Sequence, residues 1–189
     1  MNQAIKLKSM TIAGLLCAVG IIIPMFAPKI VMEPASFTLA SHVSIFIAMF
    51  ISPPIAISVA LITSVGFFIA GFPLIIVLRA LTHLVFATLG AFILKKNGNM
   101  LLSKKSITIF SLFISFVHAL CEVMVVSIFY WGDNMSSTYY DKGYLLAVIG
   151  LVGLGTMIHS MIDFSIAVFV WKPLQSIITI PANAKVRVK

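Results

Sequence analysis

Ionisable side chains occur in pairs inside three hydrophobic stretches of this sequence. The pairs are Arg79/His83, His118/Glu122 and His159/Asp163. A spacing of four residues places both members of a pair on one face of a helix. Each stretch is long enough to cross a bilayer, where a charged residue near the centre costs about 2.5–3.5 kcal/mol on insertion scales. Such residues face a bundle interior, a cavity or a partner, so we expect lipid-soluble helices around a polar interior.

The composition is that of an integral membrane protein. Of the 189 residues, 61% are hydrophobic and 10% are charged, and the mean hydropathy is +1.15. An ordinary soluble domain carries about 25% charged residues. The polar surface that a soluble domain of this length needs is missing. We therefore predict an all-α integral membrane protein with one transmembrane substrate-binding domain, residues 1–189.

A formal net charge of +8 would fit a nucleic-acid partner, but the placement of the charges indicates membrane topology instead. In a six-span arrangement ten basic residues fall on one side, whereas Lys29 and Lys142 fall on the other. Cytoplasmic loops carry an excess of Lys and Arg, so both termini are expected in the cytoplasm and no nucleic acid is expected. The ten are Lys6, Lys8, Lys95, Lys96, Lys104, Lys105, Lys172, Lys185, Arg187 and Lys189.

Turn signals divide the chain into six expected spans. Pro53-Pro54 separates the second from the third, because the residue before a proline is disfavoured in helical geometry. Asn97-Gly98-Asn99 forms an inner hairpin between the fourth and the fifth. Two longer outer connections, 27–37 and 132–143, are either lids over a binding site or solvated connectors. The six spans are 10–26, 38–52, 54–69, 73–94, 107–131 and 144–171.

Small residues recur in the first span at a spacing of four. The two overlapping pairs are Ala13/Cys17 and Gly14/Ala18. Such pairs let another helix approach closely in lipid, where packing drives helix association. This face either docks a partner or packs inside the protein's own bundle, and the spacing leaves both interpretations open.

A ligand pocket is expected in the outer half of the bundle. At about 1.5 Å per residue, Arg79 and His83 lie about 9 and 15 Å below the outer end of their helix. Glu122 and His118 lie about 13 and 20 Å below the same end. His42 lies near the outer end of the second span. One interpretation is a buried ion pair between Arg79 and Glu122, and the other, which three histidines at compatible depths favour, is a pocket.

Aromatic and polar residues follow at the outer end of the fifth span. Trp131 fits an interfacial belt, but its closeness to Asn134 also leaves room for stacking on a flat ligand ring. We interpret His159 and Asp163 as a structural histidine–carboxylate hydrogen bond. The predicted substrate-binding residues are Arg79, His83, His118, Glu122, His42, Trp131 and Asn134.

Metal transport is an alternative, because His83, His118 and Glu122 are possible ligands of Zn, Ni or Co. The sequence has no dense cluster of His, Cys and Asp, so no metal and no cofactor is predicted. It also has no His-Glu-x-x-His, Gly-x-Ser-x-Gly or Gly-x-x-x-x-Gly-Lys-Ser/Thr motif. We therefore expect that the protein is not an enzyme and that any ATP is hydrolysed by another subunit.

These residues resemble the S components, the substrate-binding membrane subunits, of energy-coupling factor (ECF) vitamin transporters. The resemblance covers about the whole chain and is strongest at 10–18, 35–54 and Leu78-Arg-Ala-Leu-Thr-His83. It implies vitamin capture at the outside of a prokaryotic cell membrane. It also implies that Ala13, Gly14, Cys17 and Ala18 dock on a transmembrane coupling subunit, the T component, which works with two ATP-binding cassette ATPases.

A pocket of Arg, His, Glu and aromatic side chains suits a heteroaromatic compound with hydroxyl or carboxyl groups. Pyridoxine or hydroxymethylpyrimidine is the expected substrate, followed by niacin and then pantothenate. An independent small-solute or metal-ion transporter is the alternative function, and a structural membrane subunit is the third.

Overall fold

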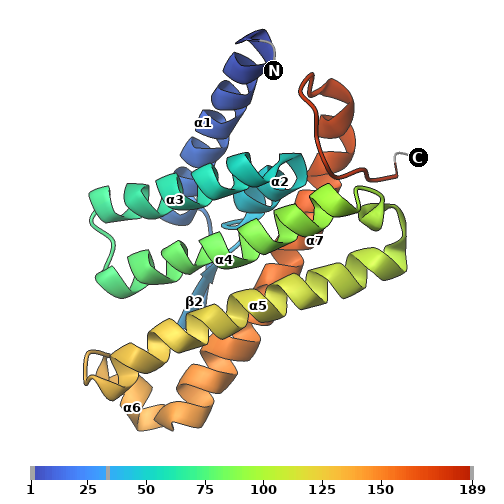
Figure 1. Ribbon diagram of the computed structural model, residues 1–189. Coiled ribbons are helices and arrows are strands. Elements are labelled where there is room, and N and C mark those ends of the chain that lie inside the picture. The colour runs from blue at the N-terminus through green and yellow to red at the C-terminus, as the bar shows by residue number, and fades with distance from the viewer. Residues whose placement is uncertain (1–2, 33–34, 188–189) are drawn as a thin grey trace.

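The computed structural model describes residues 3–32 and 35–187, and helices dominate it (Figure 1). One short antiparallel hairpin joins the first two helices, with Ile30 opposite Phe37 and Lys29 opposite Thr38. Along the chain the elements are α1 (Gln3–Phe26), β1 (Lys29–Met32), β2 (Ala35–Thr38), α2 (Val43–Ile51), α3 (Pro53–Ile69), α4 (Leu74–Lys96), the 3-10 helix η1 (Met100–Leu102), α5 (Lys104–Trp131), α6 (Ser137–Tyr144), the π-helix η2 (Leu145–Leu154) and α7 (Gly155–Ile177).

Among residues 3–32 and 35–187, four helical segments have the length and apolar composition to cross a membrane. They are α1, α4, α5 and the stretch Ser137–Ile177, which combines α6, η2 and α7. Helix α3 is also apolar but has only 17 residues. The prediction of a helical membrane protein is therefore confirmed.

The predicted second span, 38–52, is not one continuous helix. Thr38 ends β2, a turn follows, and α2 covers only the nine residues Val43–Ile51. Every residue of α2 is buried inside the protein. A short apolar run has the same composition whether it faces lipid or a protein core, so hydropathy alone could not identify this element as a core helix.

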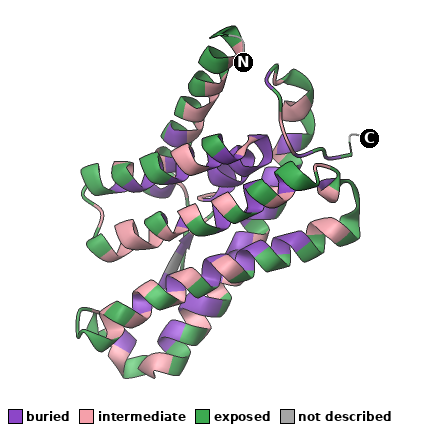
Figure 2. Ribbon diagram, in the orientation of Figure 1, coloured by how far each residue is buried: buried purple, intermediate pink, exposed green. Residues whose placement is uncertain are grey.

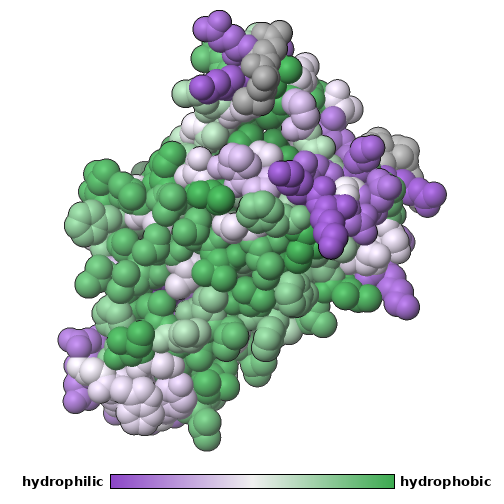
Figure 3. Space-filling model, in the orientation of Figure 1, coloured by the Kyte–Doolittle hydropathy of each residue, from purple (hydrophilic) through white to green (hydrophobic). Residues whose placement is uncertain are grey.

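The surface of the molecule carries a belt of apolar side chains. Figure 3 shows hydrophobic residues over the middle of the visible face, with hydrophilic residues toward its top and right side and at its lower left. Large side chains such as Phe68, Phe92, Phe116 and Met124 are exposed within the apolar helices. Exposed apolar surface on this scale marks an interaction with lipid, because soluble monomers keep such patches small.

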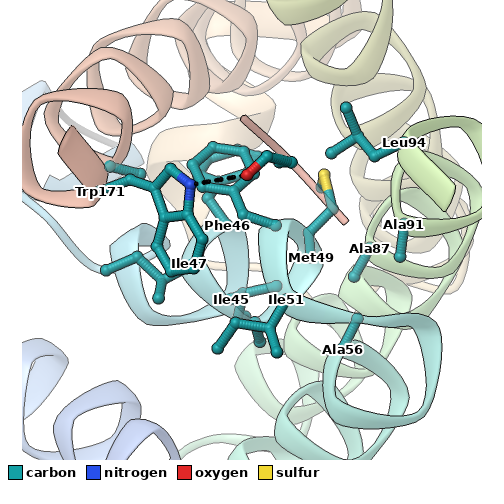
Figure 4. Close-up of a cluster of buried hydrophobic side chains, with 14 of the residues drawn as sticks. Ile45, Phe46, Ile47, Met49, Ile51, Ala56, Ala87, Ala91, Leu94 and Trp171 are labelled. Carbon is teal, nitrogen blue, oxygen red and sulfur yellow. Dashed lines mark hydrogen bonds between the residues drawn. The ribbon is translucent and has the colours of Figure 1, made fainter. Parts of the chain in front are cut away.

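The core of the protein surrounds α2 (Figure 2). Phe46 and Phe50 of α2 both contact the ring of Phe164 in α7, at centroid distances of 5.2 and 5.6 Å. Ala87 and Ala91 of α4 are fully buried next to α2, where their small side chains allow close packing (Figure 4). Helix α2 thus occupies the centre that the longer helices enclose.

Segments close to the two ends of the chain lie together at one end of the bundle. Lys8 Nζ donates a hydrogen bond to Thr179 Oγ1 at 3.1 Å, which joins α1 to the segment after α7. The backbone N–H of Lys185 donates to the carbonyl of Gly98 at 3.0 Å, in the connection between α4 and α5. The buried Trp171 indole donates to the carbonyl of Ala184 at 3.1 Å (Figure 4). The basic segments predicted for one side of the membrane are therefore neighbours.

Substitutions at two glycines of α1 can test how closely this helix packs against its neighbours. A Cβ at Gly20 would lie 2.7 Å from both Ser44 Oγ and Thr63 Cγ2, whereas a Cβ at Gly14 would meet no atom within 4 Å. Overpacking costs about 1–3 kcal/mol, so Gly20→Ala should lower the thermal unfolding midpoint in detergent by several degrees. Gly14→Ala is the matched control and should leave the midpoint unchanged or raise it. Equal midpoints for the two variants would contradict this packing.

Candidate functional site

A cavity of about 140 Å³ lies among the β1–β2 hairpin and helices α1, α2, α3, α4, α5 and α7. For comparison, an engineered cavity of about 150 Å³ is large enough to bind benzene. The volume therefore suits one small ring. The wall consists of Gly20, Pro24, Lys29, Phe37, Thr38, Ser41, His42, Ile45, Thr63, Phe67, Phe72, Ile76, Arg79, Ala80, His83, Glu122, Thr156 and His159.

A buried ion pair forms one part of this wall. Arg79 Nη2 donates to Glu122 Oε2 at 2.8 Å, and Thr156 Oγ1 donates to the same oxygen at 2.7 Å. These contacts tie α4, α5 and α7 together. The guanidinium Nε of Arg79 is buried and has no hydrogen-bond partner in the described part of the chain. Arg79 and Glu122 thus fasten helices and line the cavity at the same time.

The four histidines of the chain form one cluster. The ring of His42, at the N-cap of α2, lies 4.8 Å from that of His83 and 4.7 Å from that of His118. The rings of His83 and His118 are 4.9 Å apart. On the other side of His42, the ring of His159 is 5.1 Å away. The cluster joins α2, α4, α5 and α7 next to the ion pair.

Asp163 of α7 holds the turn that precedes α2. Its Oδ1 accepts the backbone N–H of Ala40 at 2.8 Å, and its Oδ2 accepts the backbone N–H of His42 at 2.9 Å. The same Oδ2 lies 3.0 Å from Nδ1 of His42. Ala40 has a φ of 65°, in the left-handed region. A non-glycine residue in this conformation is strained and depends on surrounding contacts, which Asp163 supplies here.

The structure brings most of the predicted substrate-binding residues together. Arg79, His83, Glu122 and His42 line the cavity, and His118 is fully buried behind them. These residues come from three separate parts of the sequence, the N-cap of α2, α4 and α5. The depth comparison along the helices therefore identified side chains that share one site.

Trp131 and Asn134 were predicted in the pocket, but they are not among the residues of the cavity wall. Trp131 is 72% exposed, and its ring lies 5.3 Å from that of Tyr144. The Asn134 side chain donates to the carbonyl of Gly132 at 2.6 Å. Trp131 and Asn134 were placed in the pocket because they follow the fifth span in the sequence. Helix α5 extends beyond the cavity, so residues at its end do not reach the cavity wall.

Other wall residues were missed by the sequence analysis. Phe37 of β2 is buried, and its ring lies 5.4 Å from that of His159. The hairpin that carries Phe37 lies almost entirely in the predicted outer connection 27–37, where no strand pattern was recognised. Thr156 and His159 lie on the same face of one helix, and this spacing could have predicted that both belong to the cavity wall.

The predicted hydrogen bond between His159 and Asp163 is not the main contact of either residue. His159 Nε2 lies 3.4 Å from Asp163 Oδ2 but 3.1 Å from Ser41 Oγ. Asp163 is instead bonded to the backbone N–H groups of the turn before α2.

The small residues of α1 divide into two faces. Cys17 is buried, and Ala13 is half-buried against the core. Gly14 and Ala18 are exposed. The Ala13/Cys17 pair therefore packs within the protein, whereas the Gly14/Ala18 pair is open to another helix.

Comparison with known proteins identifies the family. The niacin transporter NiaX of Lactococcus lactis subsp. cremoris (strain MG1363) is 43% identical to this chain over 163 residues. The matched region covers 86% of this chain and 72% of that protein. This chain belongs to the ECF S components. No family model and no solved structure matches it.

Membership of the S components confirms the resemblance seen in the sequence and makes the protein a membrane subunit of vitamin uptake. In an S component the polar interior has a direct use, because a water-soluble vitamin must be held within a protein that lipid surrounds. The cavity between the hairpin and the helices is the candidate place for it.

The hydroxyl of Thr156 provides a test of the ion-pair network. Thr156→Val removes a hydrogen bond to a buried carboxylate, which is worth about 1.5–3 kcal/mol, and should lower the unfolding midpoint in detergent. Thr108→Val is the matched control, because the exposed Thr108 hydroxyl donates to the carbonyl of Lys104 in its own helix. Its effect should stay within about 0.5 kcal/mol. A Thr156→Val midpoint equal to that of the control would count against the network.

Proposed function

We propose that this protein is the high-affinity niacin-binding S component of an ATP-driven ECF uptake transporter. The observation that carries the proposal is the 43% identity with the niacin transporter NiaX, which extends over 86% of the chain. A cavity of single-ring size with an arginine in its wall supports the same substrate.

The proposed substrate departs from the order expected from sequence. A mixed polar and aromatic pocket suits all three heteroaromatic compounds, and pyridoxine and hydroxymethylpyrimidine were placed before niacin. The relative NiaX is a niacin transporter, which does not support that preference, so we now rank niacin first. Charge supports the change, because the wall contains the cations Lys29 and Arg79 against the single carboxylate of Glu122. Either cation can pair with the carboxylate of nicotinate, which a neutral ring with hydroxyl groups lacks.

The wall offers a complementary position for each part of nicotinate. Arg79 keeps an unpartnered Nε beside its bond to Glu122, and a guanidinium is well suited to a carboxylate. Phe37, Phe67 and Phe72 supply an apolar surface for the ring. The ring nitrogen then lies on the histidine side of the cavity. In this arrangement the vitamin is held between the ion pair and the hairpin.

Membership of the S components is the basis for the partner subunits that we propose. The chain carries no phosphate-binding loop motif, so we assign ATP hydrolysis to two ATP-binding cassette partners and no enzymatic activity to this subunit. A transmembrane T component links them to it. We place the contact with the T component on the exposed Gly14/Ala18 pair of α1.

We further propose that the chain crosses the membrane six times, with the turn before α2 and the buried α2 as the second crossing, and that both termini lie in the cytoplasm of a prokaryotic cell. The bonds from Lys8 to Thr179 and from Lys185 to Gly98 support this topology, because they gather the lysine-rich segments at one end of the bundle. The cavity-lining Lys29 and the α6 residue Lys142 belong to the outer side.

Removal of the Arg79 side chain should abolish most of the binding. Losing a charge-assisted hydrogen bond costs about 1.5–3 kcal/mol, so Arg79→Ala should weaken nicotinate binding by roughly 10- to 150-fold. Isothermal titration calorimetry of the purified protein measures this directly. The preference for nicotinate over nicotinamide should shrink by a similar factor, since the amide lacks the negative charge.

Lys105→Ala is the control for this experiment, because it also removes one cation but at an exposed position of α5 away from the cavity. Its affinity for nicotinate should equal that of the wild type. Unchanged affinity in Arg79→Ala would contradict the binding mode. Tighter binding of pyridoxine or hydroxymethylpyrimidine than of nicotinate by the wild type would contradict the substrate.

Bulky side chains on the open face of α1 should separate this subunit from its partners. Gly14→Leu and Ala18→Leu are expected to abolish copurification with the T component while niacin binding persists, because neither residue lines the cavity. Ser165→Leu, at an exposed position of α7, is the control and should copurify normally. An intact complex from both α1 variants would argue against this face. Sustained niacin accumulation in a host that lacks the coupling subunits would favour the alternative, an independent transporter.

A further inference from the structure

We propose that His42, His83, His118 and Glu122 form a binding site for one divalent transition-metal ion, best suited to zinc, at the wall of the cavity. Three imidazoles and one carboxylate are a usual ligand set for tetrahedral zinc. The four residues belong to the N-cap of α2, to α4 and to α5. The sequence offered His83, His118 and Glu122 as possible ligands, and the structure adds His42 to them.

The distances fit a common central ion. The ligand atoms of the three histidines all lie within 4.8 Å of one another. Zinc–nitrogen bonds of about 2.0–2.1 Å place two ligands of a tetrahedral ion about 3.3 Å apart. Glu122 Oε1 already lies 3.5 Å from His118 Nε2 and 3.8 Å from His83 Nε2. Binding would require side-chain rotations that bring the histidine nitrogens, now within 4.8 Å of one another, to about 3.3 Å.

The hydrogen bonds of Glu122 leave one oxygen for a metal. Its Oε2 accepts from Arg79 and Thr156. Its Oε1 is the oxygen nearest the two histidine nitrogens. The carboxylate is therefore held in place by one oxygen and presents the other to the histidine cluster.

Buried ring nitrogens without partners are the second observation. Both ring nitrogens of His83 and both of His118 are buried and make no hydrogen bond in the described part of the chain. His83 is 6% exposed and His118 is 0% exposed, so bulk solvent hardly reaches these rings. A buried polar group without a partner costs about 1–3 kcal/mol. A bound ion accounts for one nitrogen of each ring and for their approach to Glu122.

The contacts of His42 are those of a metal ligand. Its Nδ1 lies 3.0 Å from Asp163 Oδ2, and Asp163 also accepts the backbone N–H groups of Ala40 and His42. A carboxylate in this role is an acceptor, so the ring proton of His42 sits on Nδ1 and the Nε2 lone pair is free. Histidines that bind metals usually donate their second nitrogen to a carboxylate in this way.

A neighbouring group, His42 with His159 and Asp163, also has its ligand atoms within reach of one another. It is the weaker candidate, because Asp163 already accepts two backbone N–H groups and the ring of His42. The Nε2 of His159 is 3.1 Å from the hydroxyl of Ser41. These atoms have hydrogen-bond partners, whereas the ring nitrogens of His83 and His118 have none among the described residues.

Zinc binding can be measured without the vitamin, so the result is independent of the niacin proposal. The full chain is purified in detergent with a tag that contains no histidine, treated with a chelator and dialysed against zinc chloride. Elemental mass spectrometry should find one zinc per chain. Asp163→Asn should weaken zinc binding by about 10- to 100-fold, and His118→Ala, which removes a ligand, should weaken it further.

His159→Ala is the matched control, since it removes a buried histidine of the same cluster and should retain one zinc per chain. His118→Gln replaces His118→Ala if the alanine variant does not elute as a monodisperse protein. A separate measurement needs no variant. When Co²⁺ replaces zinc in the wild type, the visible absorption of the bound ion should be that of tetrahedral Co²⁺. Less than one zinc per wild-type chain would overturn the proposal. Loss of zinc from His159→Ala with retention in His118→Ala would also overturn it, in favour of the neighbouring group.

Discussion

The bond between Arg79 and Glu122 is the contact on which the interior of this protein depends. Both residues lie in helices long and apolar enough to cross a membrane, where an unpaired charge would cost several kcal/mol. Their direct contact at 2.8 Å, with Thr156 as a third member, removes most of that cost and fixes α4, α5 and α7 relative to one another. A buried ion pair of this kind adds little to the net free energy of folding. Separating its two charges inside the protein is costly, however, so the pair favours the one helix arrangement in which they meet.

Helix α2 is placed by a second polar contact of the same kind. Asp163 in α7 accepts the backbone N–H groups of Ala40 and His42, at the start of α2, where the helix dipole favours a negative charge. The nine residues that follow are buried on every side. One carboxylate therefore sets the start of the core helix and the position of the His42 ring at the cavity. Folding of the core and construction of the site use the same bonds.

The sequence predicts those features that depend on long apolar runs and on spacing within one helix. The runs 54–69 and 107–131 correspond to α3 (Pro53–Ile69) and α5 (Lys104–Trp131), because proline and polar turns bound them. The meeting of Arg79 with Glu122 was predictable from depth along two antiparallel helices. The β1–β2 hairpin and the burial of α2 were not, since both depend on which elements pack around them. Trp131 and His159 show the same limit, because helix position alone did not tell which residue faces the cavity.

The charges around the cavity connect the proposed ion with the proposed vitamin. If the histidines are counted as neutral and the exposed Lys29 is left out, the half-buried Arg79 contributes +1 and the buried Glu122 and Asp163 contribute −2, so these interior groups sum to −1. Nicotinate would raise the deficit to −2 in a region of low dielectric constant, where uncompensated charge is costly. A divalent ion at the three histidines and Glu122 brings the total to zero. The metal site and an anionic ligand therefore favour each other by simple electrostatics, and the histidine cluster gains a role that a neutral ligand would not require.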